Sequence, residues 1–144
     1  MFRKNRFLSS VKNEYDLVIN DSKYLFFFLS VAPEIHMLKH FKGDSVTVRN
    51  GELLEIPADV LGLPIPKIEW SKDDVVIETP TETLLIDTEV TGRMNCETKL
   101  SIPAVNRKDH GSYAVSASNN MGSAKHTISV MVLGELRPNT QASA

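Results

Sequence analysis

The chain has 144 residues, of which 42% are hydrophobic and 24% are charged, and its formal net charge is −2 at neutral pH. This composition is typical of a soluble globular protein, and the length fits one domain of ordinary size with tails. The small negative charge gives no overall attraction to nucleic acid or to anionic lipid. The sequence therefore argues against a nucleic-acid partner and against a membrane partner.

Residues 1–31 are expected to lie outside the domain. They begin with basic residues and end in the apolar run Tyr24–Leu29, which is too short to span a membrane as a helix. As a secretory signal the run has a small-residue exit at Ser30–Ala32, but acidic residues separate it from the basic start. Phe and Leu codons are rich in pyrimidines, so an apolar run just before the start of a domain is what translation of a splice-acceptor tract would produce. We therefore favour the hypothesis that residues 1–31 are disordered or artefactual, either as retained non-coding sequence or as a mispredicted exon.

Residues 32–133 show repeated short runs of the kind found in β-strands, separated by turn signals such as Asn50-Gly51 and Lys72–Asp74. No stretch has convincing helical periodicity. The pattern predicts an all-β fold, a Greek-key sandwich of two antiparallel sheets. Residues 134–144 are polar and small, as in a tail or linker. The expected strands are 34–37, 45–48, 53–60, 67–71, 75–77, 83–89, 98–102, 112–117 and 125–133.

Trp70 and the run Asp109-x-Gly111-x-Tyr113 are the most informative residues of the chain. Trp70 alternates with Ile68 on one face of its strand, so we expect the indole to fill the core from one sheet. Tyr113 is expected to open a strand of the facing sheet and to turn its hydroxyl back onto the backbone. Asp109 and Gly111 would shape this tyrosine corner.

Three motifs extend this pattern through the domain. They are Gly62-x-Pro64-x-Pro66-x-Ile68-x-Trp70, then Leu100-x-Ile102, then Asp109-x-Gly111-x-Tyr113-x-Val115-x-Ala117-x-Asn119. In order, residue type and spacing they resemble the intermediate-set (I-set) immunoglobulin domain over residues 32–133. Gly62 would allow a tight turn after its strand. The resemblance implies a structural core that includes Ala58, Trp70, Leu100, Ile102, Tyr113 and Val115.

The cysteine usage departs from the family pattern. The resemblance places the disulfide of the family at Ala58 and Val115, both apolar here, and Cys96 is the only cysteine of the chain. A bridge that closes a loop of this size typically contributes about 4 kcal/mol. Apolar replacement makes sense where such a bond would not stay oxidised. We therefore predict an intracellular immunoglobulin domain.

Residues 62–74, 98–103 and 117–122 further resemble the immunoglobulin repeats of titin-like giant muscle proteins. The resemblance implies a structural and protein-interaction module in the cytoplasm, at the sarcomere of the myofibril, that contributes to sarcomere organisation, spacing and elasticity. Its implied partners are sarcomeric filament proteins and neighbouring immunoglobulin or fibronectin type III domains. The alternative is a recognition domain of a secreted or cell-surface immunoglobulin-superfamily protein, which requires Tyr24–Leu29 to be a signal.

No pattern in the sequence indicates an enzyme, a cofactor or a metal. The histidines are His36, His40, His110 and His126, without zinc-ligand spacing. The pair Asp73-Asp74 lies in a turn signal, where we expect it to be solvated. No phosphate-binding loop or nucleophile elbow is present in the sequence. Function is therefore expected to reside in surfaces, mainly the edge strands and the loops at the two poles of the sandwich.

Overall fold

The computed structural model describes residues 14–19 and 25–134. Residues 1–13, 20–24 and 135–144 lie outside the described part, and they hold much of the predicted N-terminal segment and nearly all of the predicted tail. The strands are β1 (Glu14–Ile19), β2 (Leu25–Met37), β3 (Ser45–Arg49), β4 (Leu54–Leu63), β5 (Lys67–Lys72), β6 (Val75–Val76), β7 (Leu85–Val90), β8 (Asn95–Ile102), β9 (Gly111–Asn119) and β10 (Gly122–Leu133). A 3-10 turn, η1 (Arg107–Asp109), precedes β9.

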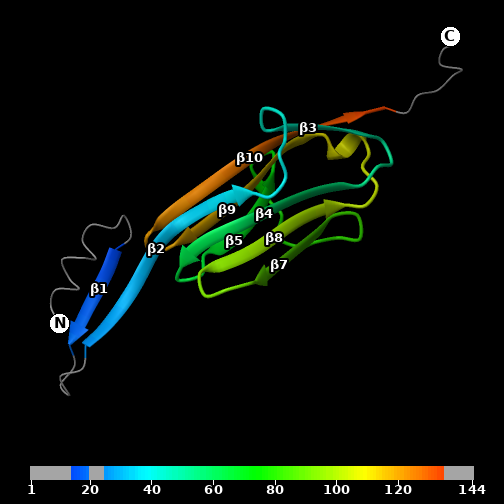
Figure 1. The fold of residues 1–144 in the computed structure, drawn as a ribbon. Helices are drawn as coiled ribbons and strands as arrows, with labels where there is room; N and C mark the ends of the chain where they lie inside the picture. The colour runs from blue at the N-terminus through cyan, green and yellow to red at the C-terminus, as the bar shows by residue number, and fades with distance from the viewer. Residues whose placement is uncertain (1–13, 20–24, 135–144) are drawn as a thin grey trace, which may run out of the picture.

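Two five-stranded sheets pack face to face (Figure 1). One sheet has the order β1-β2-β4-β8-β7 and the other has the order β3-β10-β9-β5-β6. Every neighbouring pair is antiparallel except β3 and β10, which run parallel. Each of the predicted strand ranges overlaps one of the strands from β2 to β10. The all-β sandwich predicted from the sequence is confirmed.

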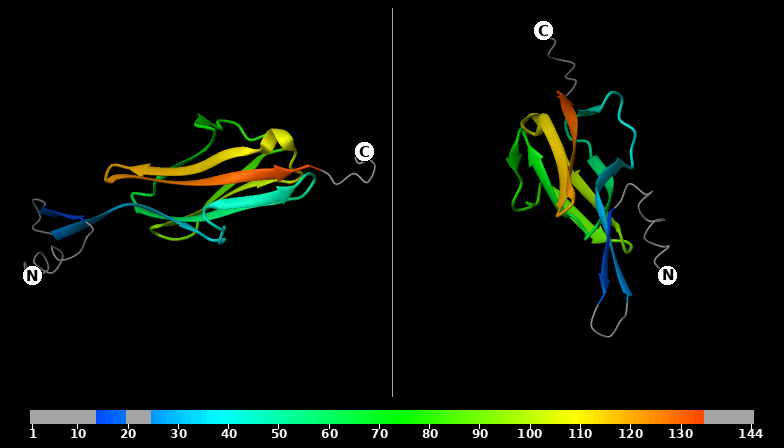
Figure 2. Two further views of the ribbon diagram at one scale, coloured as in Figure 1. Left: turned by 90° about the horizontal axis from the view of Figure 1, so that it is seen from above. Right: turned by 90° about the vertical axis from the view of Figure 1, so that its left-hand side faces the viewer.

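β2 is longer than the sequence predicts. Its first part pairs with β1, from Leu25↔Ile19 to Ser30↔Glu14, and its second part pairs with β4 after a register shift between Val31 and Glu34. The paired β1 and β2 project from one end of the sandwich (Figure 2). The strand thus crosses the predicted boundary between residues 31 and 32. The domain limits and the origin of residues 1–31 stay predictions.

The polypeptide chain enters the sandwich at one pole and leaves it at the opposite pole. β2 joins the sandwich at one pole, and β10 ends at the other (Figures 1 and 2). At that second pole β3 lies beside the last part of β10, in the parallel register Ser45↔Ser129 to Arg49↔Leu133. The amide of Asn50 continues this contact by donating to the carbonyl of Leu133 at 2.8 Å.

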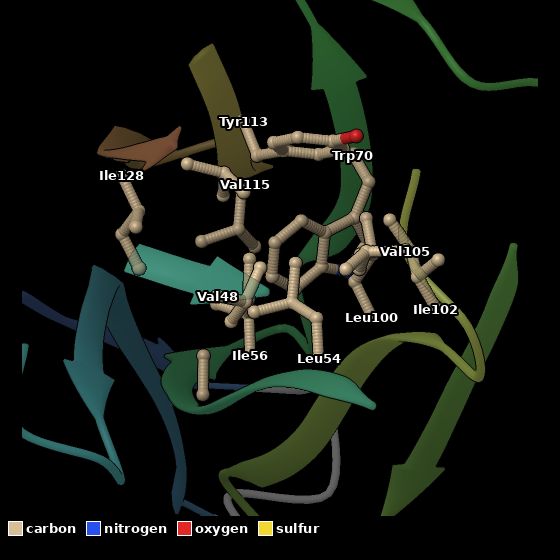
Figure 3. Packing of buried hydrophobic residues seen from close by; sticks show 12 residues of the cluster. Val48, Leu54, Ile56, Trp70, Leu100, Ile102, Val105, Tyr113, Val115 and Ile128 are labelled. Carbon is tan, nitrogen blue, oxygen red and sulfur yellow. The ribbon is translucent and has the colours of Figure 1, made fainter. Parts of the chain in front are cut away.

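The core lies between the two sheets, and the alternation of buried and less buried residues is strictest in β4. In β4 the inward residues are buried and the outward ones are half-buried. In β8 Leu100 and Ile102 face inward with no exposed surface, as predicted. Figure 3 shows the Trp70 indole surrounded by aliphatic side chains from both sheets. The buried cluster consists of Val48, Leu54, Ile56, Ala58, Trp70, Leu100, Ile102, Val105, Tyr113, Val115, Ile128 and Val130.

Gly62 has a different role from the predicted one. It lies inside β4, and a Cβ at this position would come within 2.5 Å of Pro66 Cγ and 3.4 Å of Asn119 Nδ2. The glycine is therefore required because the Pro66 ring packs directly against its backbone, and not because the chain turns there.

Candidate functional site

The two sheets are joined through a buried hydrogen bond from Trp70. The indole Nε1 donates to Thr98 Oγ1 at 2.9 Å, and both residues are 2% exposed. Trp70 belongs to β5 in one sheet and Thr98 to β8 in the other. The Thr98 hydroxyl also lies 3.2 Å from the carbonyl of Asp87, to which it donates, and 2.9 Å from Thr88 Oγ1. One threonine thus satisfies the indole N–H and links it to the edge strand β7.

The predicted placement of Trp70 and Tyr113 in facing sheets is wrong. Both lie in the β3-β10-β9-β5-β6 sheet, where Trp70 is opposite Val115 and Lys72 is opposite Tyr113. Alternation along a strand reveals which residues share a face, but it does not reveal which sheet a strand joins. The two rings therefore fill the core from the same side, and the Trp70–Thr98 bond reaches the other sheet.

Tyr113 forms a corner at the start of β9. Its ring is 1% exposed, and its hydroxyl donates to the carbonyl of Asp109 at 2.7 Å. Burial raises the pKa of the Tyr113 phenol, and the nearby carboxylates of Asp109 and Asp73 raise that pKa further. Lys72 lies over the ring at 5.7 Å from its centre, and its ammonium donates to the carbonyl of Lys108. The corner thus ties β5, η1 and β9 together at one pole.

Asp73 completes this corner, a role that the sequence did not reveal. Its carboxylate accepts a hydrogen bond from Ser112 N–H at 2.9 Å, and its amide donates to the Ser112 carbonyl at 2.7 Å. Gly111 precedes this contact with φ +154°, and a Cβ there would lie 2.8 Å from the Asp73 carboxylate oxygens. Asp73 and Asp74 both have positive φ, 48° and 67°. The β5–β6 turn thus directs the Asp73 carboxylate to Ser112, while both aspartates are exposed to solvent, as expected.

Asn119 closes the opposite pole at the other end of β9. Its Nδ2 donates to the carbonyl of Val31 at 2.8 Å and to the carbonyl of Pro64 at 3.0 Å. Its Oδ1 accepts from the amide of Met121 at 2.8 Å. The side chain therefore joins β2, the connection after β4, and the β9–β10 hairpin. The sequence motif contains Asn119, but its spacing alone does not indicate these three contacts.

The two positions assigned to the family disulfide both lie in the core. Ala58 on β4 has no exposed surface, and Val115 on β9 is 1% exposed. Cys96 is a free buried thiol on β8. Burial raises the pKa of Cys96, with a further contribution from the carboxylate of Asp59. Both effects favour the unreactive thiol over the thiolate.

Within residues 14–19 and 25–134, no group of three or more His, Cys, Asp or Glu side chains is arranged to hold a metal ion. The described part of the chain also has no helix long and apolar enough to cross a membrane. The ordered polar groups that we find tie strands together. The surfaces that remain for a partner are the sheet edges, the sheet faces and the poles.

A family model described as the immunoglobulin I-set domain matches residues 39–132. The chain belongs to the immunoglobulin I-set family. The strand order of its two sheets and the free Cys96 agree with an I-set sandwich that has no disulfide. The tyrosine corner and the buried Trp70 lie within the residues that the family model matches.

The relatives of this I-set domain include muscle proteins and a receptor. The muscle M-line assembly protein unc-89 of Caenorhabditis elegans is 33% identical over 89 residues, which cover 62% of this chain and 1% of that protein. Titin of Drosophila melanogaster is 37% identical over 79 residues, which cover 55% of this chain and, to the nearest percent, 0% of that protein. Vascular endothelial growth factor receptor 3 of Danio rerio is 34% identical over 88 residues, which cover 61% of this chain and 6% of that protein. The chain thus spans a very small part of these relatives.

Solved titin domains have the same fold. A chimeric titin Z1Z2 functionalized with an exogenous KLER peptide from decorin has a TM-score of 0.60 at 27% identity, and the match covers 74% of this chain and 99% of that one. A chain of the titin M10–obscurin-like 1 immunoglobulin complex has a TM-score of 0.58 at 27% identity, with the same coverage of 74% and 99%. The domain is therefore an immunoglobulin module related to titin and to other muscle proteins.

Proposed function

We propose that this I-set domain is a load-bearing and spacing module of a titin-like intracellular muscle protein. The observation that carries the proposal is the path of the chain through the sandwich. β2 enters at one pole and β10 leaves at the other, with β3 parallel to the end of β10. A force applied through the two ends would act along the strands, and the domain would extend a filament by its own length.

The parallel β3–β10 pair supports resistance to such a force. A pull on the end of β10 along its own direction would shear the β3–β10 contact over the whole register Ser45–Arg49 to Ser129–Leu133. Parallel strands have evenly spaced hydrogen bonds, so these bonds would carry the load together rather than open one after another. The Asn50–Leu133 bond lies at the end of this contact, next to the point where β10 leaves the sandwich.

The expected intracellular location rests on the core. With Ala58 and Val115 buried and a single cysteine in the chain, the two sheets are held by packing and by the Trp70–Thr98 bond. Such a domain has no internal disulfide that a reducing compartment would break. Its proposed partners are sarcomeric filament proteins and neighbouring immunoglobulin or fibronectin type III domains, by similarity to titin and unc-89.

Single-molecule stretching of the full chain, held by its two ends, tests the load-bearing role. Asn50→Pro removes the amide that donates to Leu133, whereas the matched variant Asn50→Ala keeps it. We expect Asn50→Pro to lower the unfolding force and to increase the unfolding rate, while Asn50→Ala behaves like the parent chain. Equal unfolding forces for the two variants would contradict a load path through β3 and β10.

A second candidate function is that of a recognition domain in a secreted or cell-surface protein. The similarity to the zebrafish receptor favours it. The two candidates predict different processing of the chain in cells. Cleavage near Ala32, found by N-terminal sequencing together with recovery from the medium or the cell surface, would support this second candidate. Recovery of the uncleaved protein with the myofibrillar fraction would support the first.

A further inference from the structure

The sandwich has an apolar cleft on one lateral side, where the edges of the two sheets diverge. The cleft has a volume of about 390 Å³ and lies between β5–β6 in one sheet and β7 in the other. Six of its eight lining residues are apolar, among them Trp70, and Glu69 and Glu78 add two carboxylates, of which Glu69 is paired with Lys67 at 2.6 Å. The lining residues are Ile68, Glu69, Trp70, Val76, Ile77, Glu78, Pro80 and Ile86.

The edge strand β7 borders this cleft and has no partner strand on its outer side in the described part of the chain. The carbonyl of Asp87 is directed toward β8, where it accepts from Thr98. Backbone groups alternate in direction along an antiparallel strand, so those of Ile86 and Thr88 point away from β8. This edge therefore offers backbone donors and acceptors to an added strand. Alternate side chains of such a strand would lie between the sheets, over the cleft.

The charge on the β6–β7 side of the cleft is of one sign. Residues 73–92 contain the acidic residues Asp73, Asp74, Glu78, Glu82, Asp87 and Glu89 and no lysine or arginine. Asp73 is bound to Ser112, and Asp74 lies 3.6 Å from Lys125. The other four have no ion-pair partner among the described residues. Like charges on an edge strand discourage pairing between two copies of the same edge, because identical acidic strands repel each other.

We propose that the β7 edge binds an extended basic peptide segment, which adds a strand to the β1-β2-β4-β8-β7 sheet and places an apolar side chain in the cleft. Main-chain hydrogen bonds along β7 provide affinity, and the cleft and its carboxylates select the partner. The partner has basic residues alternating with aliphatic ones. A second copy of this chain does not meet that description along its own β7.

The inference deepens the protein-interaction part of the proposed function, but it does not depend on the load-bearing role. If the basic peptide does not bind in the titration described below, this partner is ruled out, but the expected result of the stretching experiment does not change. Trp70 is the only tryptophan of the chain and lines the cleft, so its fluorescence reports directly on occupation of the cleft by a peptide that lacks tryptophan.

The experiment titrates the full chain with a synthetic nine-residue peptide of alternating lysine and valine. A glutamate–valine peptide of the same pattern and a backbone N-methylated lysine–valine peptide serve as controls. We expect a saturable change in Trp70 fluorescence with the lysine–valine peptide alone, weakened by added salt. Equal binding of the glutamate–valine peptide would overturn the choice of a basic partner. Equal binding of the N-methylated peptide would overturn strand addition.

Two adjacent valines provide a matched pair of variants for the cleft. Val76 lines the cleft and is 47% exposed, whereas Val75 is 69% exposed and lies outside the lining. Val76→Lys and Val75→Lys add the same charge to the same short strand. We expect Val76→Lys to weaken peptide binding at least about tenfold more than Val75→Lys, because it alone fills the cleft with a cation. Equal affinities of these variants would place the peptide elsewhere.

Glu78→Gln, on the rim of the same cleft, removes a charge without adding volume, and we expect weaker binding of the lysine–valine peptide. Melting curves confirm that each variant is folded before its titration. Light scattering of the chain alone tests self-association: dimerisation that Val76→Lys abolishes and Val75→Lys does not would assign the cleft to a second copy and overturn the proposal.

Discussion

At the scale of single residues, the Thr98 hydroxyl joins the two sheets inside the core. The alternation of Thr98 with Leu100 and Ile102 places it on the inward face. The sequence thus allowed its burial to be predicted, whereas its partner Trp70 follows only from the packing of β5 over β8. A polar residue in the alternating inward series of a strand is the sequence signal that would have pointed to this bond.

Thr98→Val is expected to destabilise the domain by about 1–3 kcal/mol, because it preserves shape and leaves the buried indole N–H of Trp70 without an acceptor. Thr98→Ser keeps the hydroxyl and serves as the control. The indole N–H resonance of Trp70, observed by NMR during hydrogen exchange, separates the two effects. It should exchange faster in Thr98→Val and remain protected in Thr98→Ser. Protection in both variants would show that another group satisfies the indole.

Tyr113 makes stability depend on pH in the alkaline range. Its pKa is raised in the folded domain above the ordinary value of 10.0, so folding favours the protonated phenol. The stabilisation is complete below pH 10 and decreases as the pH rises further, because the unfolded chain then loses the proton more readily. Denaturant unfolding between pH 9 and pH 11 should show this loss.

The variant Tyr113→Phe isolates that contribution. It removes the hydrogen bond to the Asp109 carbonyl, which is expected to cost about 1 kcal/mol at neutral pH. In this variant the free energy of unfolding should decrease less steeply with pH in the alkaline range. The decrease that remains includes the contribution of the buried thiol of Cys96, whose pKa is also raised. An unchanged slope would mean that Tyr113 is not the titrating group.

At the scale of elements, the regular strands were predictable and their assignment to sheets was not. Alternation marked β4, β5 and β8, because one face of each is buried and the other meets solvent. The first part of β2 was missed because Tyr24–Leu29 is a continuous apolar run without alternation. The corner of Asp73 with Ser112 was missed because it joins a turn and a strand that are distant in sequence.

Gly62→Ala tests the close approach of the connection after β4. The added methyl would meet the rigid ring of Pro66 at 2.5 Å, so β4 or the proline must shift. We expect a loss of about 1–3 kcal/mol, as for other overpacked positions. Gly92→Ala is the matched control, because its nearest neighbour is Asn95 Oδ1 at 3.4 Å. Thermal melting of the two variants gives the comparison, and similar melting temperatures would refute the proposed packing role.

At the scale of the whole molecule, we expect that the disulfide of the family, which this chain lacks, can be restored by substitution. If Ala58 and Val115 occupy the disulfide positions of the family, the double variant Ala58→Cys with Val115→Cys, in a Cys96→Ala background, should oxidise readily. The bridge is expected to stabilise the oxidised domain by about 4 kcal/mol relative to the reduced form. Non-reducing electrophoresis and melting with and without a reductant measure this. Failure to form the bond would refute the assignment of these two positions.

The pairing of Asp73 with Gly111 has a consequence for how such domains change during evolution. The Asp73 carboxylate occupies the space that a Cβ at position 111 would need, and it binds the next amide along the chain. The two positions form one unit divided between a turn and a strand. Any larger residue at 111 expels the carboxylate, whereas loss of the carboxylate frees the space but leaves the φ of +154° that favours glycine at this position. In a set of related domains, a carboxylate at position 73 should therefore be found only together with glycine at position 111.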